Sequence, residues 1–286
     1  MKLNKDMNIL IVGLGLLGGS YAEALKKQGY KVSAITRSRS SVDFALSKGI
    51  IDYGTTEIEP HLLGNADLVV FALYPHVFIN WIKKNQHLLK SGAVITDVTG
   101  VKGCIVGKIQ EILRDDVEFI AAHPMAGREV CGVENSTEEI FKGANYIVVP
   151  TEKNTMEATE LCRDLGEKLG FRQVSELSVE MHDKMIAFLS QLTHCIAVSL
   201  MCCNNTPDLE YYTGDSFRDL TRIAKINDEM WSELFLDNKD ALLAEMDRFK
   251  ASFDELYNKI RTGDREGMRE MMRTSTERRK RFDRNI

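Results

Sequence analysis

A glycine-rich segment near the N-terminus constrains the fold of this chain more than any other feature. Gly13, Gly15 and Gly18 follow an apolar run, Asn8–Val12, and precede a segment of helical composition, Ser20–Gln28. The first glycine allows a tight turn, the second lets the backbone approach a pyrophosphate, and the third allows close helix–strand packing. Because N–H groups at a helix start bind phosphate, the pattern predicts a dinucleotide site rather than a mere turn. The predicted cofactor-binding residues here are Gly13, Gly15, Leu16, Leu17 and Gly18.

Short apolar runs alternate with helical patterns through the first half of the chain. The predicted strands are Asn8–Val12, Lys31–Thr36, Leu68–Ala72, Ala93–Thr96, Phe119–Ala122 and Tyr146–Val149. Some of these runs are almost continuously apolar, as expected for parallel strands covered by helices on both faces. The sequence therefore predicts an α/β fold with a doubly wound parallel sheet of the Rossmann type.

The pattern changes after Pro150, and the domain boundary is expected near residue 175. An amphipathic helix is expected over Thr155–Leu169 and a last strand over Phe171–Glu176. Beyond them, apolar residues recur at helical spacing. The predicted helices are Val179–Cys203, Met230–Tyr257 and Arg265–Arg281, the last two divided near Thr262-Gly263-Asp264. We therefore predict a dinucleotide-binding domain over residues 1–175 and an all-helical domain over residues 176–286.

The residues after the second predicted strand indicate which nicotinamide cofactor would bind. An NAD site usually has an Asp or Glu about 20 residues after the first glycine, bound to the ribose 2′-hydroxyl. The corresponding segment here is Thr36-Arg37-Ser38-Arg39-Ser40, which contains no acidic residue. The first acidic residue after it is Asp43. Arginines and hydroxyls suit a 2′-phosphate. The sequence thus favours NADP, and a solvated turn that still accepts NAD is the alternative.

Charge and cysteine content narrow the classes of partner and compartment. The 286 residues include 37 Lys+Arg and 42 Asp+Glu, a net charge of −5, which gives no overall basic surface for nucleic acid or an anionic membrane. No stretch of 18 apolar residues occurs, so we expect no membrane span. The six cysteines lack zinc-site spacing, so we expect no metal site. Their even number would also permit disulfides, but a chain of this size requires none, so we expect reduced thiols and a cytoplasmic location.

Polar residues gather in three later segments of otherwise apolar or glycine-rich sequence. These segments are Asp97-Val-Thr-Gly-Val-Lys102-Gly, His123-Pro-Met-Ala-Gly and Phe217-Arg-Asp-Leu-Thr-Arg222-Ile-Ala. His123 follows a predicted strand, which places it at the carboxyl edge of the sheet, where ligands bind in open α/β folds. His194 adds a fourth polar position, on the long predicted helix.

With these motifs in this order, the chain resembles the prephenate/arogenate dehydrogenase family of tyrosine biosynthesis, from about Asn8 to Lys259. The resemblance implies a Rossmann domain joined to a helical domain that forms a homodimer. It also implies oxidative decarboxylation of a cyclohexadienol: hydride leaves the carbinol carbon for the nicotinamide of NADP or NAD, and loss of the ring carboxylate makes the ring aromatic.

The resemblance gives roles to three residues. His123 is expected to bind the substrate 4-hydroxyl and take its proton, and the alternative is a histidine that caps a buried turn. Arg222 would pair with a substrate carboxylate, and the alternative is an internal salt bridge to Asp219 or Asp228. His194 would contact the substrate side chain or carboxylate, and the alternative is a histidine satisfied within the core.

The segment from Asp97 to Lys102 departs from the family at one position. Many relatives carry Ser before Val-Lys, where its hydroxyl assists the histidine and the substrate, whereas this chain has Gly100 with Thr99 beside it. Thr99 or a water could take the place of that hydroxyl, or the reaction could be slower, so both positions count with the catalytic ones. Asp97, a cofactor candidate, and Lys102, a substrate candidate, are expected mainly to shape the nicotinamide loop.

The function that the resemblance favours is prephenate dehydrogenase, giving 4-hydroxyphenylpyruvate. The first alternative is arogenate dehydrogenase, which uses NADP and gives tyrosine directly. Other β-hydroxyacid dehydrogenases and imine reductases share the domain order but lack the His123 and Arg222 motifs. A non-catalytic NADP-binding sensor is an alternative of a different class. The expected partners are a small-molecule substrate and a second copy of the chain.

Overall fold

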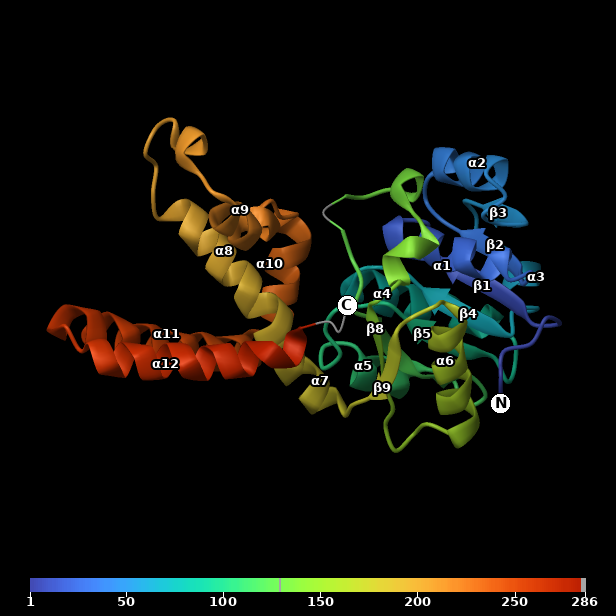
Figure 1. The fold of residues 1–286 in the computed structure, drawn as a ribbon. Helices are drawn as coiled ribbons and strands as arrows, with labels where there is room; N and C mark the ends of the chain where they lie inside the picture. The colour runs from blue at the N-terminus through green and yellow to red at the C-terminus, as the bar shows by residue number, and fades with distance from the viewer. Residues whose placement is uncertain (129, 284–286) are drawn as a thin grey trace. The chain divides into compact units, whose positions relative to one another are not determined.

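The computed structural model describes residues 1–128 and 130–283, so the last three residues of the predicted helical domain lie outside the described part. Its contacts divide the chain into two compact units, Met1–Asn238 and Lys239–Ile286 (Figure 1). The first unit contains every described strand and the helices up to α10. The second is a pair of long helices.

A six-stranded parallel sheet forms the centre of the first unit, with the order β3-β2-β1-β4-β5-β6. Its strands are β1 (Asn8–Val12), β2 (Lys31–Ile35), β3 (Tyr53–Thr55), β4 (Leu68–Phe71), β5 (Val94–Asp97) and β6 (Glu118–Phe119). This order is that of the Rossmann fold, which confirms the predicted fold class. β3 was not predicted from sequence, because Tyr-Gly-Thr is too short and too polar to form an apolar run.

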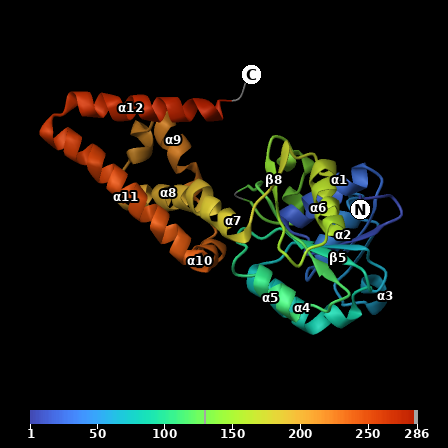
Figure 2. The same cartoon turned by 90° about the horizontal axis from the view of Figure 1, so that it is seen from below.

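Helices cover both faces of this sheet (Figure 2). One face carries α1 (Leu16–Lys27), α2 (Arg39–Ser47) and α6 (Met156–Lys168), and the other carries α3 (Pro60–Leu63), α4 (Pro75–Asn85) and α5 (Val106–Ile112). β1 contributes alternate residues to the two cores: Ile9 and Ile11 to one, Leu10 and Val12 to the other. A strand buried on both faces needs apolar residues at every position, which explains the continuous run in the sequence.

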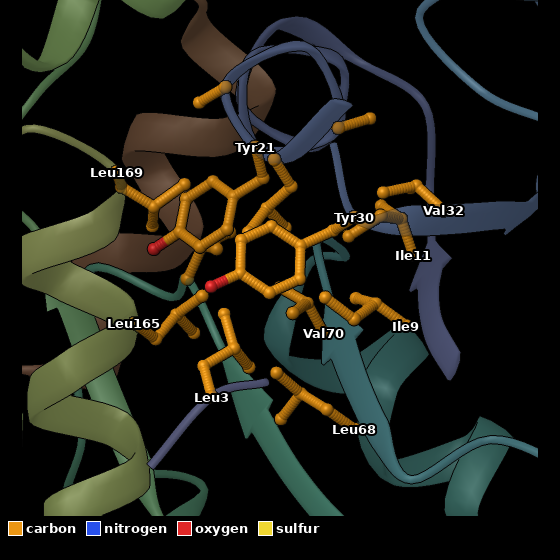
Figure 3. Packing of buried hydrophobic residues seen from close by; sticks show 14 of the residues in the cluster. Leu3, Ile9, Ile11, Tyr21, Tyr30, Val32, Leu68, Val70, Leu165 and Leu169 are labelled. Atoms are coloured by element: carbon orange, nitrogen blue, oxygen red, sulfur yellow. The ribbon is translucent and has the colours of Figure 1, made fainter. Parts of the chain in front are cut away.

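The core on the α1 face anchors the glycine turn to the sheet. Tyr21 of α1 lies there beside Tyr30, with Val70 of β4 and Leu165 of α6 around the two rings (Figure 3). Tyr21 and Leu165 are fully buried. The middle of α1 is thereby fixed against β4 and α6.

A second, three-stranded sheet corrects the prediction that all the apolar runs enter one parallel sheet. It contains β7 (Ala121–Pro124), β8 (Asn145–Val149) and β9 (Gln173–Glu176), with β7 antiparallel to β8. The predicted strand Phe119–Ala122 is therefore divided. The Ile120 N–H makes a last hydrogen bond to Ile95 O in the main sheet, at 3.0 Å, and the next residue already pairs with β8.

The predicted helix Val179–Cys203 is continuous in the structure. It consists of α7 (Val179–Ile186), a π-helical turn at Ala187–Gln191 and α8 (Leu192–Cys202). By length and composition alone, with a mean hydropathy of 1.7, Val179–Cys202 would qualify as a membrane span. Three of its polar side chains, His182, Asp183 and Gln191, instead hydrogen-bond to other segments of the first unit.

The predicted helix Met230–Tyr257 is interrupted, which corrects the sequence prediction. α9 (Asp215–Thr221) and α10 (Asp228–Asp237) belong to the first unit, and the chain leaves helical geometry at Asn238. The buried Asn238 amide donates to Asp183 O at 2.9 Å and to Gln191 Oε1 at 2.7 Å. These tertiary hydrogen bonds hold the break, and nothing local in the sequence signals them.

The second unit contains α11 (Lys239–Thr262) and α12 (Arg265–Arg279), which pack against each other. They are separated at Gly263 and Asp264, as predicted. Gly263 has a φ of 70°, a left-handed conformation that suits glycine, and the Asp264 carboxylate accepts the Gly267 N–H at 2.9 Å as the N-cap of α12.

Candidate active site

The glycine turn between β1 and α1 has the shape of a phosphate cradle. Gly13 has a φ of 102°, and a Cβ there would lie 2.4 Å from Ala72 O. A Cβ on Gly18 would lie 1.9 Å from Gly13 O, so only glycine fits at either position. Gly15 instead faces open space and begins α1 without a side-chain cap. The N–H groups of the first helical turn, which includes Leu16 and Leu17, are thus left for a pyrophosphate, and the residues fit a dinucleotide.

The segment that would face the cofactor's ribose directly follows β2. Ser38 is the N-cap of α2, and its Oγ accepts the Ser41 N–H at 3.2 Å. The Arg39 Nε donates to Asp43 Oδ1 at 3.0 Å, while Arg37 is exposed and Thr36 is half-buried. Both guanidinium groups lie on the surface. One of them has an acidic neighbour that a phosphate would have to displace.

Asp97, at the end of β5, belongs to a closed and fully buried cluster. The Lys102 Nζ lies 2.6 Å from Asp97 Oδ2 and also donates to Ala122 O at 2.5 Å. The Thr99 Oγ1 donates to the same Asp97 oxygen at 2.5 Å, and the Ala122 N–H donates to Asp97 Oδ1 at 3.2 Å. Burial lowers the pKa of Lys102, and the Asp97 carboxylate acts in the opposite direction. The cluster ties the 97–102 loop to β7.

His123, in the middle of β7, is half-buried and begins a second chain of hydrogen bonds. Its Nδ1 lies 2.9 Å from Nε2 of His182 on α7. The His182 Nδ1 in turn lies 2.7 Å from Asp183 Oδ1. The Asp183 carboxylate also accepts the Lys102 N–H at 2.8 Å and the Gly103 N–H at 2.7 Å. The chain therefore links β7, α7 and the loop after β5.

The two histidines of this chain have lowered pKa values. Burial is the main cause for His123, whose pKa falls well below 6.5, and His182 and the Lys102 ammonium lower it further. Burial also lowers the pKa of His182, although the Asp183 carboxylate opposes the change. Both imidazoles are therefore neutral near pH 7, and a neutral imidazole has a lone pair with which to accept a proton.

The remaining predicted substrate residues lie on the helical part of the first unit. The His194 ring on α8 stacks on Trp231 of α10, with centroids 3.7 Å apart, and its Nδ1 lies 2.9 Å from Ser190 O. Arg222 is exposed and begins a short turn that packs against α8. Gly100 is half-buried, and a Cβ there would lie 3.7 Å from the Leu234 side chain of α10.

Comparison with known proteins gives the same assignment over nearly the whole chain. The family model described as "Prephenate dehydrogenase, nucleotide-binding domain" matches residues 21–175, and "Prephenate dehydrogenase, dimerization domain" matches residues 178–274. The chain belongs to the prephenate dehydrogenase family. It is accordingly an NAD(P)-dependent dehydrogenase with a nucleotide-binding domain.

Individual members of this family align along most of their length. A prephenate dehydrogenase of Bacillus subtilis is 29% identical over 96% of this chain and 76% of its own length. A cyclohexadienyl dehydrogenase of Zymomonas mobilis is 30% identical over 90% of this chain and 89% of its own. A solved prephenate dehydrogenase from A. aeolicus, in complex with hydroxyphenyl propionate and NAD+, is 32% identical, with a TM-score of 0.89 over 99% of this chain and 100% of that chain.

The sequence did not identify His182 and Asp183 as part of this dehydrogenase site. They lie 59 and 60 residues beyond His123, on the first turns of a long apolar helix, and match no spacing rule. Their one signal was a His-Asp pair at polar positions in a segment that is otherwise mostly apolar. Within the described residues no group of three or more His, Cys, Asp or Glu side chains is placed to hold a metal ion.

Proposed function

We propose that this protein is a prephenate dehydrogenase, which oxidises prephenate, releases CO2 and forms 4-hydroxyphenylpyruvate. The observation that carries the proposal is His123: a neutral, half-buried imidazole beside the loop at the carboxyl end of β5, within the fold of this family. The A. aeolicus structure described above, named as a complex with hydroxyphenyl propionate and NAD+, supports the same class of ligand for this chain.

The cofactor would be held by the glycine cradle and the segment after β2. Gly13, Gly15 and Gly18 bring backbone N–H groups to the pyrophosphate, with Asp97 shaping the loop beside the nicotinamide. Arg37 and Arg39 are exposed cations beside the ribose position, which favours NADP over NAD. When bound, the nicotinamide supplies the hydride acceptor.

The side chains of the site would bind the substrate and move one proton. His123 accepts the proton of the 4-hydroxyl at Nε2, since its Nδ1 is already bonded to His182. Arg222 pairs with a substrate carboxylate, and a guanidinium does so through two parallel hydrogen bonds. His194, held by Trp231, contacts the substrate side chain. Orientation and charge pairing are the main requirements, because aromatisation of the ring supplies much of the driving force.

The active form would be a cytoplasmic homodimer. Residues 178–274 match a domain described as a dimerization domain. The long helix carries exposed apolar side chains there, with Phe188, Leu189 and Met201 exposed by 52%, 49% and 46%. Large exposed apolar side chains on one element are typical of a surface that another subunit covers. Light scattering of the purified protein should give twice the mass of 32.3 kDa.

The experiment that tests the proposal is nicotinamide reduction with prephenate and with arogenate, each with NAD+ and NADP+. We expect turnover of prephenate, faster with NADP+. Turnover of arogenate alone would make the protein an arogenate dehydrogenase. Cofactor binding without turnover of either substrate would favour the non-catalytic sensor and contradict the proposal.

A further inference from the structure

We propose that His182 is a positioning residue, which holds His123 in the tautomer with its proton on Nδ1 and its lone pair on Nε2. The inference rests on the proposed function, because a defined lone pair matters only if His123 accepts a proton. It assigns a role to two side chains, His182 and Asp183, that no motif in the sequence identifies.

Asp183 fixes the direction of the first hydrogen bond, because an ionised carboxylate can only accept hydrogen bonds. Its oxygens are fixed by the backbone N–H groups of Lys102 at 2.8 Å and Gly103 at 2.7 Å. The third neighbour is the His182 Nδ1, at 2.7 Å from Oδ1. That nitrogen must therefore carry a proton and donate it.

The next hydrogen bond of the chain joins His182 to His123. His182 is fully buried, and burial keeps its ring neutral near pH 7 by lowering its pKa. A neutral imidazole with a proton on Nδ1 has a lone pair on Nε2. The His123 Nδ1 lies 2.9 Å from that lone pair, so it must be the donor of this hydrogen bond. One nitrogen of His123 is thus occupied, and Nε2 is left as the base.

The arrangement also suits the product of proton transfer. When His123 Nε2 takes a proton, Nδ1 keeps its own, so the hydrogen bond to His182 remains and strengthens as the ring becomes charged. No partner has to rotate. The Asp183 carboxylate at the far end of the chain stabilises the imidazolium, as a buried carboxylate does behind a catalytic histidine in serine proteases.

No described side chain of the 97–102 loop is bonded to His123 as His182 is. Gly100 has no hydroxyl. The Thr99 hydroxyl donates toward Asp97 Oδ2 at 2.5 Å, with Val101 O at 3.2 Å as a second acceptor. The charged groups that act on the two histidines are Asp97, Lys102 and Asp183, and Asp97 and Lys102 form an ion pair with each other. The contact that orients His123 is therefore the one with His182.

The first test measures the tautomer directly and needs no substrate. The full-length protein, labelled with ¹⁵N at its histidines and saturated with NADP+, is examined by long-range ¹H–¹⁵N correlation at pH 7.5, with His123→Asn used to assign the signal. We expect the wild-type His123 signals to show a proton on Nδ1. A proton on Nε2 would overturn the proposal, whatever the variants do.

The second test compares two substitutions of His182. His182→Phe keeps a ring of similar size but removes the acceptor, and we expect kcat to fall by about 10²-fold, the scale of a misplaced general base. The acid limb of the pH profile should move to lower pH. A charged His182 would repel the His123 imidazolium, but the neutral His182 present near pH 7 accepts its hydrogen bond, and His182→Phe removes that acceptor. His182→Gln retains an amide oxygen near the position of Nε2 and should recover at least a tenth of the wild-type kcat.

The control is His87→Phe, the same change at an exposed histidine, which should leave kcat unchanged. Equal losses in His182→Phe and His182→Gln, with the acid limb unmoved, would indicate a merely structural role and contradict the proposal. The tautomer result separates this inference from the proposed function. If His123 carries its proton on Nδ1 but neither prephenate nor arogenate is turned over, the proposed dehydrogenase function is contradicted. The orientation of His123 by His182 is then still supported.

Discussion

Two buried carboxylates contact the same loop in this protein, and their surroundings differ. Asp97 forms an ion pair with Lys102 and accepts a hydrogen bond from Thr99. Both side chains of the ion pair are 0% exposed. Asp183 faces two backbone N–H groups and His182, and its chain of hydrogen bonds ends at a half-buried histidine. A carboxylate neutralised by a lysine can fix a loop. A carboxylate connected through histidines can also set where a proton resides.

The largest effect on rate should come from His123, the last residue of the hydrogen-bond chain that starts at Asp183. His123→Asn removes the proton acceptor, and we expect kcat to fall by between about 10² and 10⁴-fold, the range for loss of a general base. The KM for the cofactor should change little, because the glycine cradle is untouched. Steady-state kinetics with prephenate check this, and an unchanged kcat would remove His123 from the chemistry.

Substitutions in the buried cluster of Asp97, Thr99 and Lys102 should lower the stability of the fold. Lys102→Met leaves Asp97 as an unpaired buried charge, and the free energy of unfolding should fall by about 3–5 kcal/mol. Urea denaturation measures this. The double variant Asp97→Asn/Lys102→Met removes both charges but keeps an acceptor for the Ala122 N–H, so it should recover most of the loss.

An exposed pair serves as the control for this comparison. Lys142→Met disrupts the ion pair with Glu139, at 69% and 57% side-chain exposure. Its effect should stay within about 1 kcal/mol, as for surface salt bridges generally. If Lys102→Met lowers the free energy of unfolding by no more than Lys142→Met does, the Asp97–Lys102 pair contributes no more than a surface ion pair.

The same comparison shows what the sequence could and could not predict. Asp97, Thr99, Gly100 and Lys102 fall within one motif after a predicted strand, so local spacing identified them together. His182 meets His123 only because α7 packs against β8, the neighbour of β7, and that packing depends on tertiary contacts without a local signal. The parallel sheet was predictable because β1, β2, β4 and β5 are apolar runs that alternate with helical patterns. The short β3, the second sheet and the break at Asn238 depend on pairings between distant residues.

The lowered pKa values of the two histidines predict the pH dependence. His123 must be neutral to accept a proton, so kcat/KM should hold down to pH 6.5 and fall only below it. Stability follows the same sign: the unfolded histidines bind protons near pH 6.5 and the folded ones do so at lower pH, so the free energy of unfolding declines as pH falls below 6.5. A pH–rate profile and urea denaturation between pH 5 and 8 measure both. An acid limb above 6.5 would contradict the assignment to His123.

The smallest effect on stability is expected for a substitution at Gly100. The resemblance described in the sequence analysis implies a Ser at this position. The structure has room for a serine, because a Cβ at Gly100 would lie 3.7 Å from the Leu234 side chain, an ordinary contact. Gly100 is also not one of the glycines with a positive φ, so a side chain would not strain the backbone. Gly100→Ser should therefore change the free energy of unfolding by no more than about 0.5 kcal/mol.

The effect of Gly100→Ser on rate distinguishes two ways of orienting His123. If His182 already fixes the tautomer, an added hydroxyl supplies one further hydrogen bond to the substrate, worth about 1 kcal/mol, and kcat should rise by less than tenfold. If His123 instead lacks a defined orientation without that serine, kcat should rise by a hundredfold or more. Measuring kcat for Gly100→Ser in the wild-type and His182→Phe backgrounds separates the two, because a serine that substitutes for His182 should help the second background far more than the first.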